Sequence, residues 1–277
     1  MSAFDGKVAI VTGAGRRMGL GEAIARRLAA DGAAVVVSDI GRARDRTTPA
    51  GMLGSREEME SIAADIRDAG GTASTRVCDV REEGQVAALV RHAVKSYGRL
   101  DIFVNNAGIG YVMKLVTELD QDEWDTVLDV NLRGCFFGIK HAARQMIKQG
   151  TGGRIVNVAG QAAKKGFPYA AAYTSSKHAL IGLVRSTAIE LGPHGITVNN
   201  VCPNHVSTAL GAWQSTFFAD RWGMSLEQYL AEMKARIPMG RPGLPEDTAN
   251  AVAFLCSEEA GYITAESMNV SGGEETH

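Results

Sequence analysis

The stretch VAIVTGAGRRMGLGEAIA, residues 8–25, decides the fold. It begins with a short apolar run, Val8–Thr12, which is typical of a buried strand, and it ends in a segment with helical periodicity. Between the two lie Gly13, Gly19 and Gly21. Glycines let the strand turn sharply and let backbone N–H groups at the helix start face a phosphate, which the helix dipole favours. We therefore predict a strand–turn–helix unit that binds a nucleotide.

The end of the next strand indicates which nucleotide binds. Asp39 closes the apolar run Ala34–Asp39, about 20 residues beyond the glycine turn, as in dinucleotide-binding units. A carboxylate there can accept hydrogen bonds from both ribose hydroxyls and would repel a 2′-phosphate. The sequence therefore predicts NAD as cofactor rather than NADP. Arg42 and Arg44 could serve a 2′-phosphate, but their place in an inserted segment makes them weaker evidence than the carboxylate.

The same alternation continues to the end of the chain. Short runs rich in Val and Ile are separated by longer segments of helical period, one of which we expect to be a single helix, Asp122–Lys148. Strands that are apolar throughout and separated by helices indicate a parallel sheet covered on both faces, so we predict a doubly wound α/β fold. The further strands expected are Ala73–Val77, Asp101–Asn105, Gly153–Val158, Ile196–Val201 and Ser267–Val270.

Two segments interrupt this alternation. Residues 41–55 are an extra polar loop where a short connection would suffice, and residues 209–244 are rich in large apolar side chains. Aromatic residues gathered outside the α/β alternation favour pocket walls, so we predict a helical lid over a substrate pocket; the alternative is an ordinary pair of amphipathic helices. We treat residues 1–277 as one domain that carries these two additions.

Composition excludes several classes of protein. The chain has 277 residues, of which 45% are hydrophobic and 22% charged, so it can bury one large core. Its net charge of −2, without a basic stripe, argues against nucleic acid as partner, and no stretch approaches the ~20 apolar residues of a membrane span. Its four cysteines are far apart and its six histidines show no ligand spacing. We expect a cytoplasmic protein with a small-molecule substrate and no metal site.

Several motifs occur in an order that resembles the short-chain dehydrogenase/reductase family over nearly the whole chain. The resemblance implies a single Rossmann-like domain with a seven-stranded parallel sheet, a nicotinamide cofactor and the interconversion of alcohols and carbonyls. It also implies a homo-oligomer, commonly a tetramer, in which Asp122–Lys148 and Tyr173–Leu191 pair between subunits. The motifs are Thr12-Gly13…Gly19-x-Gly21, Cys78-Asp79-Val80, Asn105-Asn106-Ala107-Gly108, Asn131, Tyr173-Thr174-Ser175-Ser176-Lys177, Pro203…Thr208 and Ser271-Gly272-Gly273.

The resemblance also assigns residues to the cofactor. Asp79 and Val80 would flank the adenine, and Val206 and Thr208 would contact the nicotinamide carboxamide. The phosphate loop departs from the family pattern, because two extra residues lengthen it and Arg16 and Arg17 bulge. An arginine could touch the pyrophosphate or close over the cofactor, or the bulge could simply be solvated. The cofactor-binding residues expected are Gly13, Arg17, Met18, Gly19, Leu20, Gly21, Asp39, Asp79, Val80, Asn106, Ala107, Gly108, Tyr173, Lys177, Val206 and Thr208.

Tyr173 and Lys177 are the predicted catalytic pair. Four residues apart in a helical segment, their side chains project from one face. A tyrosine, with a pKa near ~10, is a poor base at neutral pH unless a nearby cation stabilises the phenolate. The alternative is an exposed surface pair. By resemblance, Asn131 would kink its helix and hold a water that relays protons from the lysine to solvent.

One catalytic group of the family is missing. The family places a serine thirteen residues before the tyrosine, and this chain has Gly160 there. Losing one donor to a developing oxyanion costs about 2.7–4 kcal/mol. Gln161 could replace the serine, the substrate or a water could fill the space, or catalysis could be weakened. Gln161, His205 and Trp213 are the expected substrate contacts.

These predictions describe an NAD(H)-dependent oxidoreductase of a secondary alcohol, either a cyclic or apolar alcohol, a polyol or a sugar. Gly160 motivates one alternative, an NAD-binding sensor or structural protein on the same fold. The lengthened phosphate loop and residues 41–55 motivate another, an enzyme that retains its NAD and passes electrons to a second carrier.

Overall fold

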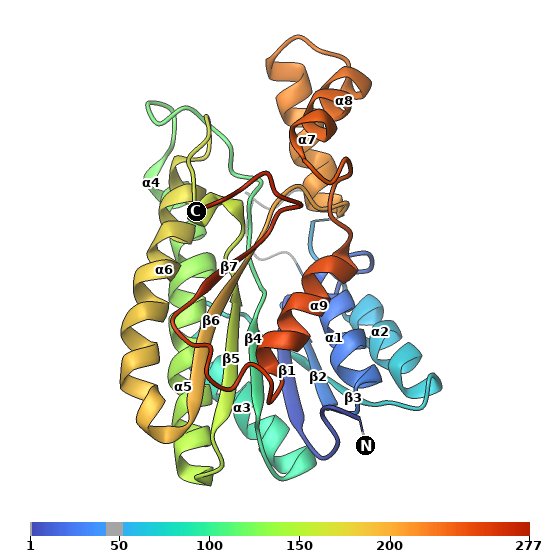
Figure 1. Cartoon of the computed structure of the whole chain (residues 1–277), viewed down its shortest axis with the longest axis vertical. Helices are drawn as coiled ribbons and strands as arrows, with labels where there is room; N and C mark the ends of the chain where they lie inside the picture. The colour runs from blue at the N-terminus through green and yellow to red at the C-terminus, as the bar shows by residue number, and fades with distance from the viewer. Residues whose placement is uncertain (1, 43–51) are drawn as a thin grey trace.

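The computed structural model describes residues 2–42 and 52–277. Seven strands form one parallel sheet in the order β3-β2-β1-β4-β5-β6-β7 (Figure 1). The predicted doubly wound α/β fold is therefore confirmed, and each predicted strand is present with only small shifts at its ends. The strands are β1 (Val8–Thr12), β2 (Ala34–Asp39), β3 (Thr72–Val77), β4 (Ile102–Asn105), β5 (Gly153–Val158), β6 (Ile196–Pro203) and β7 (Ser267–Val270).

Helices cover both faces of the sheet. Helices α1, α2 and α9 lie on one face and α3, α5 and α6 on the other, while α7 and α8 project beyond one end of the sheet (Figure 1). The helices are α1 (Leu20–Ala30), α2 (Arg56–Asp68), α3 (Glu83–Tyr97), α4 (Gln121–Leu128), α5 (Gly134–Gln149), α6 (Ala171–Leu191), α7 (Ala209–Arg221), α8 (Leu226–Arg236) and α9 (Pro245–Cys256).

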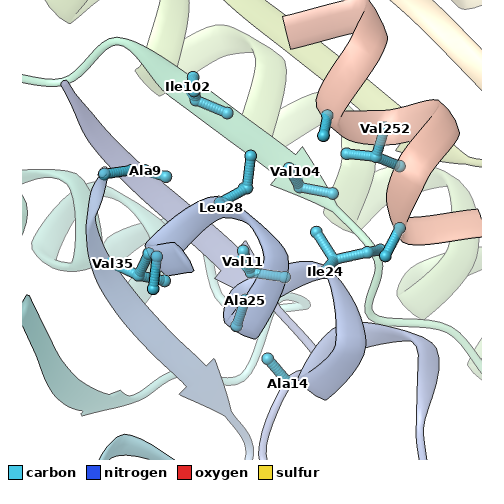
Figure 2. Packing of buried hydrophobic residues seen from close by; sticks show 14 of the residues in the cluster. Ala9, Val11, Ala14, Ile24, Ala25, Leu28, Val35, Ile102, Val104 and Val252 are labelled. Atoms are coloured by element: carbon cyan, nitrogen blue, oxygen red, sulfur yellow. The ribbon is translucent and has the colours of Figure 1, made fainter. Parts of the chain in front are cut away.

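The core is divided between the two faces by the alternation of side chains along each strand. In β1, Ala9 and Val11 face α1 and α9, where they meet Ile24 and Leu28 (Figure 2). Ile10 faces the opposite layer, between α3, α5 and α6. All of these side chains are fully buried. Since both faces are covered, the strands need no polar alternation, which explains the apolar runs in the sequence.

The helix predicted over Asp122–Lys148 is not continuous. It is divided into α4 and α5 by a π-helical turn, Asp129–Arg133, that has Asn131 at its centre. The backbone N–H of Gly134 donates to the carbonyl of Asp129, five residues earlier. Helical periodicity did not reveal this break, because the turn contains no proline or polar run, but the family resemblance placed a kink at Asn131, where the turn lies. π-Helical turns are frequent at functional sites.

The two predicted additions differ in how far the structure describes them. Residues 43–51 of the inserted loop 41–55 lie outside the described residues. Residues 209–244 contain α7 and α8, which begin at the capping side chains of Thr208 and Ser225. Aromatic side chains gather between these helices, and Phe218 and Tyr229 stack with ring centres 6.3 Å apart.

Candidate active site

A cavity of about 890 Å³ lies at the carboxyl ends of the strands. Its lining begins at the phosphate loop and the end of β2 and continues past the residues that follow β4, β5 and β6 to α7 and α8. Ligands of open parallel sheets bind at this edge, where the loops that follow the strands converge. The sheet therefore places the nucleotide motif and the catalytic motif around one space.

The phosphate loop is closed by contacts that only glycine permits. A Cβ atom at Gly21 would lie 2.4 Å from the carbonyl oxygen of Gly13, and a Cβ at Gly13 would lie 2.6 Å from the Cα of Ala107. The amide of Asn106 donates to the carbonyls of Thr12 and Gly13, each at 2.9 Å. Both glycines line the cavity. The loop therefore forms a cradle of bare backbone, which fits a pyrophosphate.

Asp39 lies where a ribose would meet this cradle. Its carboxylate is buried and accepts from the backbone N–H groups of Gly15 (2.9 Å) and Ile40 (2.7 Å). Burial raises the pKa of Asp39, while the two N–H donors oppose that shift. Asp79 and Val80 line the cavity beside it, and Asp79 forms an ion pair with Arg81 at 3.0 Å. These residues fit the adenosine end of a dinucleotide.

The two arginines of the lengthened loop point to different places. Arg16 lines the cavity and donates from Nη1 to the carbonyl of Met52 at 3.0 Å. Arg17 instead forms an ion pair with Asp65 of α2 at 2.6 Å, and it does not line the cavity. The structure therefore does not bring Arg17 to the predicted cofactor site, because the acidic face of α2 holds its guanidinium. Met18, the next residue, does line the cavity.

Tyr173 and Lys177 lie on one face of α6, as their spacing predicts. The Lys177 ammonium nitrogen lies 5.8 Å from the centre of the Tyr173 ring and donates to the carbonyl of Val158 at 2.8 Å. Both side chains line the cavity. Desolvation raises the pKa of Tyr173 to about 12 and lowers the pKa of Lys177. Burial thus favours the neutral form of each group, so a phenolate at neutral pH needs further positive charge in the cavity.

Asn131 is fully buried and its amide is satisfied within the protein. Its Oδ1 accepts from the N–H of Ile109 at 2.8 Å, and its Nδ2 donates to the carbonyl of Ile109 at 2.9 Å and to the hydroxyl of Ser176 at 3.1 Å. The side chain therefore joins the segment after β4 to α6, the helix that carries the Tyr–Lys pair. A proton relay at Asn131 would consequently use its backbone rather than its amide.

Gly160 lies beside the tyrosine, at the place where the family carries a serine. A Cβ at Gly160 would be 3.6 Å from the Tyr173 hydroxyl, so there is space for a side chain. The backbone disfavours one, because φ is +85° and ψ 170°, a conformation in which any residue other than glycine is strained. The neighbouring Gln161 lines the cavity, and its Nε2 is buried without a hydrogen-bond partner among the described residues.

The predicted substrate contacts are only partly brought together. His205 lines the cavity, and desolvation lowers its pKa. Trp213 does not line it, because the indole stacks on Phe217 with ring centres 5.6 Å apart. Its neighbour Gln214 takes that place and donates to the carbonyl of Gly110 at 2.9 Å. On a helix, one position decides whether a side chain faces the cavity or packs behind it.

The remaining predicted cofactor residues lie in the cavity wall. Val206 and Thr208 line it after β6, and Thr208 also caps α7 by accepting from the N–H of Gly211 at 3.1 Å. Four charged lining residues were missed by sequence reasoning: Lys165, Arg236, Glu274 and Arg81. No motif marks the first two, and Glu274 is signalled only by its place directly after the terminal Ser271-Gly272-Gly273. The predicted residues Gly19, Leu20, Asn106, Ala107 and Gly108 also line the cavity.

Comparison with known proteins identifies the family. The family model described as Enoyl-(Acyl carrier protein) reductase matches residues 13–275. A short-chain dehydrogenase/reductase of Armillaria gallica is 39% identical over 272 residues, which cover 98% of this chain and 97% of the relative. The chain belongs to the short-chain dehydrogenase/reductase family. As a member of this family it is an oxidoreductase that uses a nicotinamide cofactor.

Solved structures of other short-chain dehydrogenases/reductases share the fold. Carveol dehydrogenase from Mycobacterium avium in complex with NAD superposes with a TM-score of 0.91 at 32% identity, covering 99% of both chains. A variant of actinorhodin polyketide ketoreductase with NADPH superposes with a TM-score of 0.88 at 37% identity, covering 100% of both chains. Similar structures thus hold either cofactor, so the preference of this chain depends on its own residues.

Residues 2–42 and 52–277 of this short-chain dehydrogenase/reductase contain neither a candidate membrane span nor a metal-binding cluster. None of its helices is both long and apolar enough to span a bilayer. Within the same residues, no group of three or more His, Cys, Asp or Glu side chains is arranged to hold a metal ion.

Proposed function

We propose that this chain is an NAD(H)-dependent oxidoreductase that interconverts a secondary alcohol and its carbonyl. The observation that carries the proposal is that Tyr173 and Lys177 line the same cavity as the glycine cradle and Asp39. A nicotinamide cofactor, when bound, accepts or supplies the hydride. Apolar and aromatic side chains from α7 and α8 line the other end of the cavity, which supports their role as a lid over an apolar substrate body.

The roles of the two catalytic residues follow from their chemistry. In oxidation the Tyr173 phenolate takes the proton of the substrate hydroxyl as hydride leaves the same carbon; in reduction the phenol returns that proton to the carbonyl oxygen. Lys177, within 5.8 Å of the ring centre, stabilises the phenolate when it is protonated. Asn131 positions the pair through Ser176 and Ile109.

Gln161 is the proposed replacement for the missing serine. It follows Gly160 directly in the chain, and its buried Nε2 has no hydrogen-bond partner among residues 2–42 and 52–277. A buried donor without a partner costs about 1–3 kcal/mol, so a ligand oxygen that accepts from it is favoured. A substrate carbonyl bound near Tyr173 would supply that oxygen.

The proposed preference for NAD rests on Asp39. Its carboxylate would accept from ribose hydroxyls and repel a 2′-phosphate, whereas Arg16, which also lines the cavity, would attract one. We expect the wild type to prefer NADH over NADPH. In Asp39→Ser that preference falls about tenfold or more, the loss expected for a hydrogen bond to a charged group.

The test is kcat/KM with each reduced cofactor and a panel of ketones, with Asp68→Ser as the control. Asp68 is exposed at the end of α2, so its replacement leaves the preference unchanged. If the wild type prefers NADPH, the proposal is wrong, and Arg16 is then the residue expected to bind the 2′-phosphate.

A second candidate function is favoured by the contact between the inserted loop and the phosphate loop. A Cβ at Gly54 would lie 2.0 Å from the carbonyl oxygen of Gly15, and Arg16 donates to Met52. The described end of the insertion therefore packs directly on the cradle, which supports an enzyme that retains its NAD and passes electrons to another carrier. Such a protein carries NAD through gel filtration and turns over poorly with added NAD. Tight binding of NAD, with no turnover of any compound in a broad panel of alcohols and sugars, would instead favour an NAD-binding sensor.

We also propose that the chain assembles as a homo-oligomer through α5 and α6. Phe136 and Ile147 of α5 are 44% and 39% exposed, and Ile189 of α6 is 77% exposed. Exposed apolar side chains on two adjacent helices are the feature that supports contact with another subunit. A tetramer and a cytoplasmic location stay predictions from the sequence.

A further inference from the structure

The lid end of the cavity carries a charged cluster that the proposed chemistry does not use. Lys165 follows β5, Arg236 ends α8, and Glu274 lies near the carboxyl terminus. All three line the cavity, together with His205. The Glu274 side chain is 9% exposed, whereas those of Lys165 and Arg236 are 41% and 47% exposed. Segments far apart in the sequence thus converge on one polar wall.

Glu274 is held at this wall by the packing of its own segment. A Cβ at Gly273 would lie 3.1 Å from the side chain of Pro238, and the carbonyl of Gly272 accepts from the N–H of Met239 at 3.1 Å. The segment before Glu274 therefore lies against the residues that follow α8. The amide of Asn204 donates to the Glu274 carboxylate.

The cations around Glu274 do not make close hydrogen bonds with it. Lys165 Nζ lies 3.8 Å from one carboxylate oxygen, Arg236 Nε 3.6 Å from the same oxygen, and His205 Nε2 3.5 Å from the other. Lys165 also lies 3.4 Å from the carboxylate of Glu275. Close charge-assisted hydrogen bonds are about 2.7–2.9 Å long. Donors and acceptors thus face the cavity wall with hydrogen-bonding capacity that a ligand could use.

The balance of charge decides which kind of ligand fits. Two cations, Lys165 and Arg236, line the wall with one carboxylate, Glu274. The Glu275 carboxylate does not line the cavity but lies buried behind the wall, 3.4 Å from Lys165, where it offsets the second positive charge, and desolvation favours neutral His205. The wall therefore has little net charge and little preference for an anion or a cation. It offers N–H donors and carboxylate acceptors side by side, a set complementary to a hydroxyl group, which both donates and accepts.

We propose that Lys165, Arg236 and Glu274 form a second polar subsite of the substrate cavity, which binds a neutral hydroxyl carried by the substrate away from the reacting carbon. The inference rests on the proposed function and deepens it: the substrate is a bifunctional alcohol, with an apolar body between its two oxygens. The cavity wall fits such a body, because Phe167, Phe218, Trp222, Tyr229 and Met233 line it.

The test uses 4-substituted cyclohexanols of graded chain length whose substituent ends in hydroxyl, methyl or carboxylate. We expect the wild type to oxidise the hydroxyl-ended compounds with a kcat/KM about tenfold or more above their methyl-ended partners. Glu274→Gln and Arg236→Gln lose that preference while they keep their rate on the methyl-ended compounds. The matched controls are Glu232→Gln and Lys234→Gln, exposed positions of α8 outside the cavity wall, and both keep the preference.

A role of Glu274 in structure alone predicts a different result. In that case Glu274→Gln lowers the rate on every alcohol alike, and this outcome overturns the subsite. A wild type that prefers the carboxylate-ended compounds, and improves on them in Glu274→Gln, overturns it in favour of an anion site.

A binding measurement separates failure of the subsite from failure of the proposed function. The melting temperature of the protein with NADH is followed as each compound is added. Hydroxyl-ended compounds that stabilise the protein more than methyl-ended ones, with no turnover of any alcohol, support the subsite and contradict the proposed function. If the enzyme turns over the alcohols but does not prefer the hydroxyl-ended compounds to the methyl-ended ones, the proposed function is supported and the subsite is contradicted.

Discussion

The nucleotide end and the substrate end of the cavity are built in different ways. At the nucleotide end, backbone approaches backbone, and a Cβ at Gly21 would come within 2.4 Å of the Gly13 carbonyl oxygen. At the substrate end, side chains from distant segments meet, such as Phe167, Phe218 and Tyr229. Side chains cannot be added at the nucleotide end without a clash. At the substrate end, side chains can be replaced while the helices that carry them stay in place. The rigid nucleotide end therefore suits one fixed ligand, whereas the side chains of the substrate end can be exchanged to select a substrate, and variants can test this difference.

The largest effect on turnover is expected from replacing the proposed acid–base residue Tyr173 while the nucleotide end stays unchanged. Tyr173→Phe removes the proton donor and acceptor, so turnover falls about 10²–10⁴-fold. NADH binding, measured by fluorescence titration, stays near wild type, because the phosphate cradle and Asp39 lie at the other end of the cavity. A Tyr173→Phe protein with full activity would remove the tyrosine from the mechanism.

The rates of oxidation and reduction are expected to change in opposite directions as the pH rises. Desolvation places the pKa of Tyr173 at about 12 without cofactor, and oxidation needs the phenolate. The rate of oxidation therefore rises with pH up to the pKa that Tyr173 has in the complex, and the rate of reduction falls above it. Lys177→Met removes a cation near the phenolate, so both limbs move to higher pH. If the pH dependence of both rates is unchanged in Lys177→Met, Lys177 does not set the pKa of Tyr173.

The next effect concerns the nucleotide end alone. Gly21→Ala forces a Cβ against the Gly13 carbonyl and the Asn106 amide, and we expect it to lower the free energy of unfolding by about 3 kcal/mol and to abolish NADH binding. Gly84→Ala is the control, since a Cβ in the first turn of α3 meets nothing within 4 Å and stabilises the helix by about 0.5–1 kcal/mol. Chemical denaturation measures both. Equal stability of the two variants would contradict the close approach in the cradle.

The smallest effect tests the boundary between the two ends, at Gly160. Gly160→Ser finds space beside Tyr173 but must adopt φ +85°, so we expect a loss of about 2 kcal/mol in stability and no gain in turnover. Gln161→Ala, by contrast, lowers turnover and leaves stability near wild type. Thermal unfolding and initial rates distinguish the two. A faster Gly160→Ser enzyme, or a Gln161→Ala enzyme at the wild-type rate, would show that Gln161 does not replace the serine.

Sequence reasoning succeeded where one local segment makes the whole feature. The glycine turn, Asp39 and the Tyr173–Lys177 pair were predicted from spacing and type, and the structure brings all of them to one cavity. The structure does not bring Trp213 to the cavity wall, because the helical position that faces the cavity depends on where α7 lies. It does not bring Arg17 there either, since its partner Asp65 comes from a different helix.

The residues alone were enough to predict the parallel α/β fold, the glycine cradle and the proposed catalytic pair, because each follows from local patterns of residues and from backbone rules that hold in any fold. The conformation of Gly160 and the meeting of Lys165, Arg236 and Glu274 became visible only in the folded chain. These features arise from packing between distant segments, and no local pattern of residues records which segments will meet.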